Sequence, residues 1–321
     1  MPSLSFLSPA AALVALLAAV PIAAFVRRER RAQRVRRTLG LAEPRRDPAA
    51  VVALLAVPIL LGLAASQPVL DRGATVETRS DAEVFFVLDT SRSMAAAAGP
   101  DTPTRFARAR TSALRIRAEL ADVPAGIATL TDRTLPHLFP TADPRPFRAT
   151  LERSIGIERP PPGRSQIGRV TDLGALAGIA EHGFFSRAAT KRLLVVLTDG
   201  ETRPVTGSLA SVLAGAGIRT VFVHTWRPDE GIYATSEREP EYRSDPSSAG
   251  DLRTTAASVR GMVVDEDDLG GAVRQARAAL GSGPVERQRL RDLLALMPHL
   301  TLVAAVPFGL VLLRRNVPRK R

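Results

Sequence analysis

The chain has 321 residues, of which 45% are hydrophobic and only 4% are aromatic, and its formal net charge is +12. It contains no cysteine, which excludes disulfides, thiolate metal sites and a cysteine nucleophile. The scarcity of aromatic residues argues against a protein that binds single-stranded nucleic acid, so we expect no nucleic-acid partner.

Three long apolar runs stand at residues 7–26, 49–66 and 293–313. Each approaches the roughly 20 residues that a helix needs to cross a bilayer core. The sequence therefore predicts an N-terminal transmembrane helix within residues 1–26, a second at 48–66 and a third at 293–313. Buried core helices are the alternative, and the first run could also be a cleaved signal peptide. Residues 1–6 carry no charge, however, whereas a signal peptide begins with a basic region.

The positive charge is concentrated beside these runs. Residues 27–47 hold nine arginines and three acids, and residues 314–321 hold five basic residues and no acid. Basic segments next to spans stay in the cytoplasm. We therefore expect a multi-pass protein of the cell membrane with a basic cytoplasmic loop, 27–47, a basic cytoplasmic tail, 314–321, and residues 67–290 outside. Lipid headgroups or a protein partner are further candidates for the arginine-rich loop.

Between the second and third runs, strand and helix patterns alternate. Short apolar runs predict strands, and longer amphipathic segments predict helices. In chain order we expect a strand at 84–88, a helix at 104–120, strands at 125–130 and 134–138, a helix at 144–155, a loop at 159–165, a helix at 171–181, a strand at 192–198, a helix at 207–216, a strand at 218–224, a helix at 249–259, a strand at 261–264 and a helix ending near 280. This alternation indicates an α/β domain over residues 80–280, with a doubly wound, mostly parallel, Rossmann-like sheet.

Two segments of this region lie outside the alternation. Residues 227–245 are polar, contain both tyrosines and predict a long loop, which is either a partner-facing insertion or a mobile edge. Residues 281–292 predict a linker to the third run.

Carboxylates and hydroxyls follow the predicted strands where a ligand would bind. Asp89 ends the first strand, Ser91 and Ser93 come two and four residues later, and Asp199 follows the strand at 192–198. Thr171 opens a predicted helix at the same rim. In open parallel sheets ligands bind beyond the carboxyl ends of the strands. Five oxygen ligands without sulfur or imidazole favour a hard divalent cation, Mg²⁺ or alternatively Mn²⁺.

At these residues the sequence resembles the von Willebrand factor A (vWA) domain and its metal-ion-dependent adhesion site. The family pattern is Asp-x-Ser-x-Ser after the first strand, a later threonine, and an aspartate in Thr-Asp-Gly. It falls on Asp89, Ser91, Ser93, Thr171 and Asp199. Residues 102–110 are similar to the start of the first helix in bacterial members. With the predicted spans, the chain resembles the membrane-anchored Bat proteins of the aerotolerance type. Arg92 departs from the pattern, because many members have glycine there.

The resemblance implies binding rather than catalysis. In such domains the metal accepts an acidic residue from a protein partner, and Bat-type proteins are linked with MoxR-type AAA+ ATPases and with the assembly or protection of envelope complexes. We therefore expect a non-enzymatic, membrane-anchored interaction module, with a MoxR-type ATPase and other Bat-type proteins as possible partners.

Two rival functions stay open. An aspartate beside magnesium at a strand end could be the nucleophile of a phosphotransfer enzyme, but such enzymes need a second acid two residues later, where this chain has Ser91. Alternatively, the domain is a metal-free scaffold in which Asp89, Asp199 and the serines only cap turns and helices.

The acidic run 265–268 precedes a predicted helix and is interpreted as complementing its dipole. The four histidines are scattered, which argues against zinc.

Overall fold

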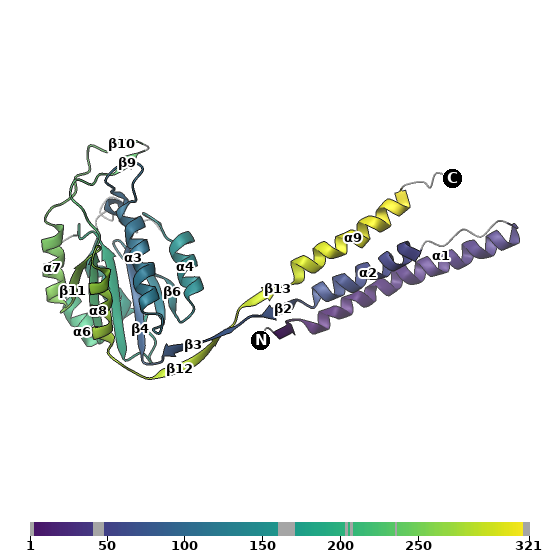
Figure 1. Ribbon diagram of the computed structural model, residues 1–321, viewed down its shortest axis with the longest axis horizontal. Coiled ribbons are helices and arrows are strands. Elements are labelled where there is room, and N and C mark those ends of the chain that lie inside the picture. The colour runs from purple at the N-terminus through teal and green to yellow at the C-terminus, as the bar shows by residue number, and fades with distance from the viewer. Residues whose placement is uncertain are drawn as a thin grey trace. The chain divides into compact units, whose positions relative to one another are not determined.

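The computed structural model describes residues 3–40, 48–159, 171–202, 205, 208–234 and 236–316. The chain forms two compact units (Figure 1). One consists of Met1–Ala74 with Arg289–Arg321, and the other of Thr75–Gln288. The loop predicted at 159–165 lies, apart from its first residue, outside the described residues.

The larger unit is built on a six-stranded sheet in the order β11-β8-β7-β4-β5-β6 (Figure 1). Its strands are β4 (Ala82–Asp89), β5 (Ala125–Leu130), β6 (Thr134–Thr141), β7 (Lys191–Thr198), β8 (Ile218–His224) and β11 (Met262–Asp265). Neighbouring strands are parallel except at the edge, where β6 runs antiparallel to β5. The predicted α/β class and mostly parallel sheet are therefore correct.

Helices cover both faces of this sheet, which explains why its central strands are continuously apolar. On β4, Phe86 and Leu88 point to one face and Phe85 and Val87 to the other, as the two-residue period of a strand requires. The first face packs against α3 (Arg105–Glu119), α4 (Pro144–Arg153) and α8 (Leu269–Leu280). The second packs against the short 3₁₀ segment η4 (Leu173–Leu176), α5 (Ala177–Glu181), α6 (Leu209–Gly215) and α7 (Ser248–Ser258).

Local signals set the helix boundaries. Thr104 caps α3 by accepting a hydrogen bond from the backbone NH of Ala107, and Asp143 caps α4, which begins at Pro144. Asp268 caps α8 by accepting from the backbone NH of Gly271. This last contact agrees with the interpretation of the acidic run 265–268 as a helix start rather than a metal site.

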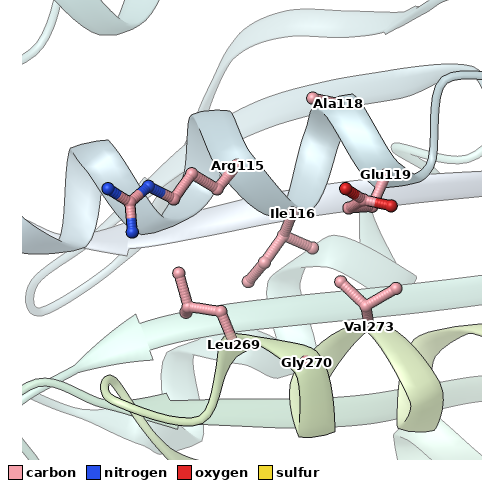
Figure 2. Close-up of a pocket in the computed structure, with 7 residues that line it drawn as sticks. All are labelled: Arg115, Ile116, Ala118, Glu119, Leu269, Gly270 and Val273. Carbon is pink, nitrogen blue, oxygen red and sulfur yellow. The ribbon is translucent and has the colours of Figure 1, made fainter.

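Helices α3 and α8 leave an open groove between them on the larger unit. Its volume is about 400 Å³, and Figure 2 shows side chains of both helices along it. The apolar side chains of Ile116, Leu269 and Val273 line it, together with Arg115 and Glu119. None of the five predicted metal ligands lines this groove, so it is separate from the candidate site.

Shorter strands complete the larger unit. β9 (Tyr233–Ala234) and β10 (Glu237–Arg238) pair within the segment predicted as a long loop. β3 (Ala74–Arg79) pairs with β12 (Val285–Leu290), which falls within residues 281–292. Arg79, only 4% exposed, forms an ion pair with Asp81 and donates to the carbonyl of Gly281 at 2.7 Å. This arginine thus holds the end of α8 beside the start of the sheet.

The smaller unit contains an antiparallel sheet and packed helices. The sheet has the order β1-β2-β13, with β1 (Ser3–Phe6), β2 (Pro68–Asp71) and β13 (Leu293–Ala295). The helical elements are the 3₁₀ segment η1 (Pro9–Ala18), α1 (Ala19–Thr38), α2 (Pro48–Ala65) and α9 (Met297–Asn316). α2 packs against both α9 and η1.

The prediction of three transmembrane helices is wrong. Across the described parts of the chain, no helix combines the length and the apolar character needed to cross a membrane. The first apolar run is divided between η1 and α1, and α1 continues into the arginine-rich segment. The second forms an 18-residue helix that contains Pro58. The first residues of the third run form β13. Helix α9 begins after them and includes basic residues that follow the run.

The predicted membrane topology depended on those three helices and is therefore not supported. A multi-pass membrane location, with residues 67–290 outside, follows only from the three spans and the charges beside them. The domain boundaries at 26, 47, 66, 80, 280, 292 and 313 stay predictions.

Candidate metal centre

The candidate site lies where the strand order reverses. The chain passes from β4 outward to β5 and β6, then returns so that β7 pairs with the other side of β4. The crevice at the carboxyl ends of the two strands beside such a reversal is the usual ligand site of an open α/β sheet. Asp89 ends β4, and Asp199 directly follows β7. In each case a buried apolar strand precedes the aspartate, so the strand ends where the polar side chain begins.

Asp89 is completely buried, and both of its carboxylate oxygens accept hydrogen bonds. Oδ1 accepts from the backbone NH of Ser91 at 2.9 Å. Oδ2 accepts from the hydroxyl of Thr198 at 2.6 Å and from that of Thr171 at 2.9 Å. These donors come from three segments of the chain and hold the carboxylate in one orientation.

The five predicted ligands form a connected set. The hydroxyl of Thr171 reaches Asp89, and the hydroxyls of Ser91 and Ser93 lie 3.0 Å apart. A hydrogen bond from the hydroxyl of Ser93 lowers the pKa of Asp199. All five side chains therefore meet at the carboxyl ends of the central strands. Their coordination of a metal stays a prediction.

Thr171 reaches the site through contacts on both sides of the crevice. It pairs with Thr202 in an isolated parallel bridge, and the hydroxyl of Thr202 donates to the carbonyl of Thr171 at 2.9 Å. The next residue, Asp172, donates its backbone NH to the carbonyl of Thr131 at 2.9 Å. The threonine is thereby fixed between the loops that follow β5 and β7.

Arg105, a buried residue at the start of α3, forms an ion pair with Asp199. Both side chains are 0% exposed, and Nη1 of Arg105 lies 2.9 Å from Oδ2 of Asp199. The same guanidinium contacts Glu201 at 2.8 Å and Glu230 at 2.6 Å. One cation thus contacts three carboxylates, and such a buried cluster persists only because every member has a partner.

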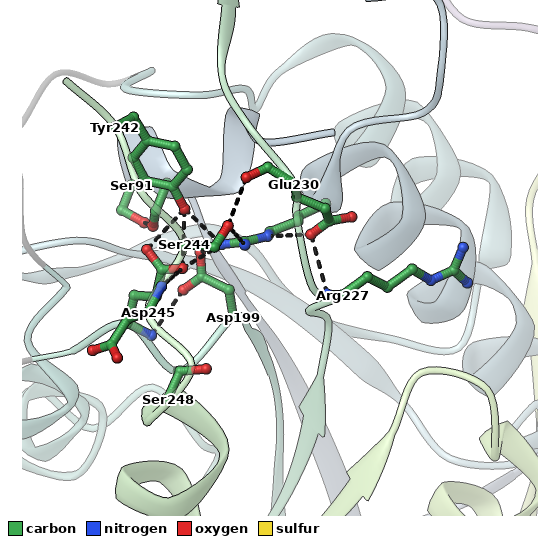
Figure 3. A network of polar contacts seen from close by, with 12 residues as sticks. Ser91, Asp199, Arg227, Glu230, Tyr242, Ser244, Asp245 and Ser248 are labelled. Atoms are coloured by element: carbon green, nitrogen blue, oxygen red, sulfur yellow. Dashed lines mark hydrogen bonds and ion pairs between the residues drawn. The ribbon is translucent and has the colours of Figure 1, made fainter. Parts of the chain in front are cut away.

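Arg105 also ties the loop after β8 to the site. Its Nη1 donates to the hydroxyl of Tyr242 at 2.9 Å, and its Nη2 donates to that of Ser244 at 2.8 Å. The hydroxyl of Tyr242 donates to Glu201 at 2.8 Å, and the backbone NH of Asp245 donates to the same carboxylate at 3.1 Å. Figure 3 shows Tyr242 and Ser244 beside Asp199.

Negative charge exceeds positive charge in this cluster. Five carboxylates that are at most 12% exposed, together with the three guanidiniums linked to them or to the predicted ligands, leave two negative charges when all are ionised; the exposed Asp267, which also contacts Arg227, is not counted. The carboxylates are Asp89, Asp199, Glu201, Glu230 and Glu266, and the guanidiniums are Arg105, Arg108 and Arg227. A divalent cation would balance this charge.

The pKa values of the two aspartates are both raised. Burial raises the pKa of Asp89, despite the hydroxyl donors that act in the opposite direction. Burial also raises the pKa of Asp199, and the neighbouring charge of Asp89 raises it further, whereas Arg105 lowers it. A cation at this position would reverse both effects, because it favours the ionised carboxylates.

The donor set fits a hard divalent ion. Two carboxylates and three hydroxyls would supply oxygen ligands, and Mg²⁺ readily retains water at its other positions. The set contains only two acidic side chains. Accordingly, the described residues include no group of three or more His, Cys, Asp or Glu side chains placed to hold a metal. Coordination here would depend on the hydroxyls.

Sequence reasoning missed the residues that support the ligands. Thr198 precedes Asp199 and donates to Asp89, and Arg105 and Glu201 build the buried cluster. The segment 102–110 indicated only a resemblance, and nothing in it predicts a contact with a residue 94 positions away. The position of Arg105 on the apolar face of α3 is the one local signal of its burial.

Comparisons with known proteins give structural matches only. No protein-family model and no curated protein matches the chain. BatB from Bacteroides thetaiotaomicron matches with 21% identity and a TM-score of 0.49, over 63% of this chain and 100% of that one. An aerotolerance-related membrane protein from Bacteroides fragilis matches with 22% identity and a TM-score of 0.45, over 62% of this chain and 98% of that one.

A third match is a mussel protein with an occupied site. Proximal thread matrix protein 1 from the mussel byssus, with zinc in its metal-ion-dependent adhesion motif, is 15% identical, with a TM-score of 0.41. The match covers 75% of this chain and 53% of that one. Bat-type proteins are thus among the structures that this chain resembles, as its sequence motifs implied. The strand order and connections described above establish the fold.

Proposed function

We propose that the larger unit is a protein-interaction module that depends on a divalent metal held by Asp89, Ser91, Ser93, Thr171 and Asp199. The observation that carries the proposal is the position of Asp89 and Asp199 at the ends of adjacent parallel strands, beside the reversal of strand order. Three hydroxyls join them there.

Each residue has a defined part in this proposal. Asp89 and Asp199 supply negative charge, and the hydroxyls of Ser91, Ser93 and Thr171 supply neutral oxygens. Neutral ligands leave positive charge on the ion, which would then attract a carboxylate from a partner at an open position. Thr198 and Arg105 orient the two aspartates and do not need to contact the metal.

The geometry favours binding over phosphotransfer. An aspartate-based phosphotransfer enzyme of the kind considered above uses a second acid two residues after its nucleophile. Ser91 stands where such an enzyme would have its second acid. We therefore propose a non-enzymatic role.

A metal-free scaffold is the second candidate, and Arg105 is the observation that favours it. Its guanidinium already provides Asp199 with a counter-charge at 2.9 Å. If that contact were sufficient, the domain would present its loops without any ion. The surplus of two negative charges around the site argues for the metal instead.

Calorimetric titration of Mg²⁺ and Mn²⁺ into the full chain tests the proposal. We expect saturable binding to one site, and loss of that binding in Asp89→Ala. Asp101→Ala is the matched control, because it removes an exposed carboxylate outside the cluster. Equal binding by both variants would place the ion elsewhere, and no binding by the folded wild-type chain would favour the scaffold.

The identity of the partner is a prediction from the resemblance alone. A protein that presents an acidic residue fits the proposed open position on the metal. A MoxR-type AAA+ ATPase, other Bat-type proteins and a role in assembling or protecting envelope complexes are the specific expectations. Affinity purification in Mg²⁺ and in chelator, with Asp89→Ala as the control, would test them.

A further inference from the structure

The loop after β8, residues 227–245, is fastened to the loop that carries Ser91 and Ser93. We call the described residues of this segment, 227–234 and 236–245, the insertion. Ala97 and Gly231 exchange two backbone hydrogen bonds, at 2.8 and 2.9 Å. Arg105 binds the same segment through Glu230, Tyr242 and Ser244. The insertion is therefore a fixed border of the candidate metal site.

Arg92 connects the metal loop to this border. The hydroxyls of Ser91 and Ser93 turn toward each other, and the side chain between them extends to the insertion. Nη2 of Arg92 donates to both carboxylate oxygens of Glu239, at 2.7 and 2.6 Å. The contact with Glu239 thus orients the guanidinium of the residue that lies between two proposed metal ligands.

The contact with Glu239 uses only part of the donor capacity of Arg92. A guanidinium has five N–H donors, and Nη2 alone makes the bonds to Glu239. Within the described residues, Nε and Nη1 of Arg92 have no hydrogen-bond partner. The side chain of Arg92 is 42% exposed, so these donors are open to solvent.

Stability is a weak explanation for this ion pair. Exposed ion pairs contribute about 0–1 kcal/mol, and Glu239 is itself 27% exposed. Arg105 shows, on the same domain, that one guanidinium can contact several carboxylates at once. Glu239 therefore fixes the orientation of Arg92 without preventing it from binding a second carboxylate.

We propose that Arg92 is a specificity-determining residue that binds a second acidic side chain of the partner. The partner segment would carry two carboxylates: one completes the metal, and the other accepts a hydrogen bond from Nη1 of Arg92. Glu239 is the positioning residue. This inference rests on the proposed function, since the first carboxylate needs the metal.

Selection from a random peptide library tests this preference even though the partner is unidentified. The full chain, loaded with Mn²⁺, is used to select phage-displayed 12-residue peptides that elute with chelator. We expect enriched peptides to share two acidic residues at a fixed spacing. In parallel selections with Arg92→Gln, only one acidic position should remain enriched.

A double-mutant cycle then assigns the contact. The best wild-type peptide and its variant with the second acid changed to the amide are titrated into the wild-type chain and into Arg92→Gln. Either change alone should weaken binding by about 3- to 10-fold, and the two together should weaken it no further. Glu239→Gln should lower the preference for the second acid while leaving Mn²⁺ binding intact.

The outcomes separate this inference from the proposed function. Peptides with a single acid, additive effects in the cycle, or peptides rich in Lys and Arg would each overturn the role of Arg92 while leaving the metal site in place. Normal Mn²⁺ binding without chelator-dependent peptides would also overturn it. Absence of Mn²⁺ binding by the folded chain would overturn the proposed function itself.

Discussion

Nη1 of Arg105 lies 2.9 Å from Oδ2 of Asp199, and both side chains are completely buried. The arginine belongs to the first helix after the Asp-x-Ser-x-Ser loop, and the aspartate follows a strand 94 residues later. This contact makes Arg105 an internal counter-charge for a proposed metal ligand. It also connects the insertion to the metal site, because Tyr242 and Ser244 bind the same guanidinium.

Removing the charge of Arg105 should strongly destabilise the domain. Arg105→Gln leaves Asp199, Glu201 and Glu230 buried without their shared cation, and breaking such a cluster costs about 3–5 kcal/mol. Arg105→Lys keeps the charge and should cost less. Urea denaturation measures the free energy of unfolding. Arg148→Gln is the control, since Arg148 is exposed and its ion pair with Glu152 is worth about 0.5 kcal/mol or less.

Gly200 should be irreplaceable by alanine. It follows Asp199 with φ of +75°, and a Cβ would lie 2.8 Å from the carbonyl oxygen of Ser248. We expect Gly200→Ala to lose about 1–3 kcal/mol of stability from the backbone conformation alone and to weaken metal binding by displacing Asp199. Gly215→Ala is the matched control: no atom lies within 4 Å of its Cβ, and a helical position gains from alanine.

Thr198 should affect metal binding although it is not a proposed ligand. Its hydroxyl donates to Oδ2 of Asp89 at 2.6 Å. Thr198→Val keeps the shape but removes the donor, so we expect about 10- to 100-fold weaker metal binding, as for other supporting residues of metal sites. Thermal denaturation shows whether the variant is folded. Unchanged metal affinity in a folded variant would contradict a role for Thr198 in orienting Asp89.

The metal-free domain should lose stability as pH rises because of Asp89. Its pKa is raised above the unfolded value of 3.8, so the folded state retains a proton that the unfolded state releases. The contribution is fully present below pH 3.8 and is lost as pH rises through the raised pKa. Unfolding free energies measured in chelator from about pH 4 to about pH 8 should fall more steeply for wild type than for Asp89→Asn.

Other carboxylates change stability in the opposite direction and serve as an internal control. Hydrogen bonds from Arg79 and Arg277 lower the pKa values of Asp81 and Asp122. Their contributions are present above the unfolded pKa and are lost as pH falls through the lowered one. Asp89→Asn should leave this acid limb unchanged. An equal pH dependence in both proteins above about pH 4 would contradict the assignment to Asp89.

Divalent metal should stabilise the wild-type domain by mass action. At a free Mg²⁺ concentration about 100 times the dissociation constant, linkage adds about 2.7 kcal/mol to the free energy of unfolding. The midpoint of thermal unfolding should therefore rise with Mg²⁺ in wild type. It should stay constant in Asp89→Ala, and a rise in both proteins would reveal a nonspecific ion effect.

Local sequence patterns are enough to predict the alternation of strands and helices and to place two carboxylates at strand ends. Both depend on local information: a short apolar run predicts a buried strand, and a polar residue directly after it marks the rim. β5 was predicted at Ala125–Leu130 and β8 at Ile218–His224, as observed. The Asp-x-Ser-x-Ser spacing likewise specifies neighbours within five residues, where the backbone itself limits the geometry.

The tertiary structure alone decided which segments meet. Pairing β7 with β4 brings Asp199 and Thr198 to Asp89, and no local pattern encodes that adjacency. Burial of Arg105 depends on carboxylates contributed by Asp199, Glu201 and Glu230, so its role is invisible within α3. The apolar runs failed as transmembrane predictors for the same reason. Hydropathy does not predict helix boundaries or strand pairing. In the structure, the first run is divided between two helical elements, and part of the third run forms a strand.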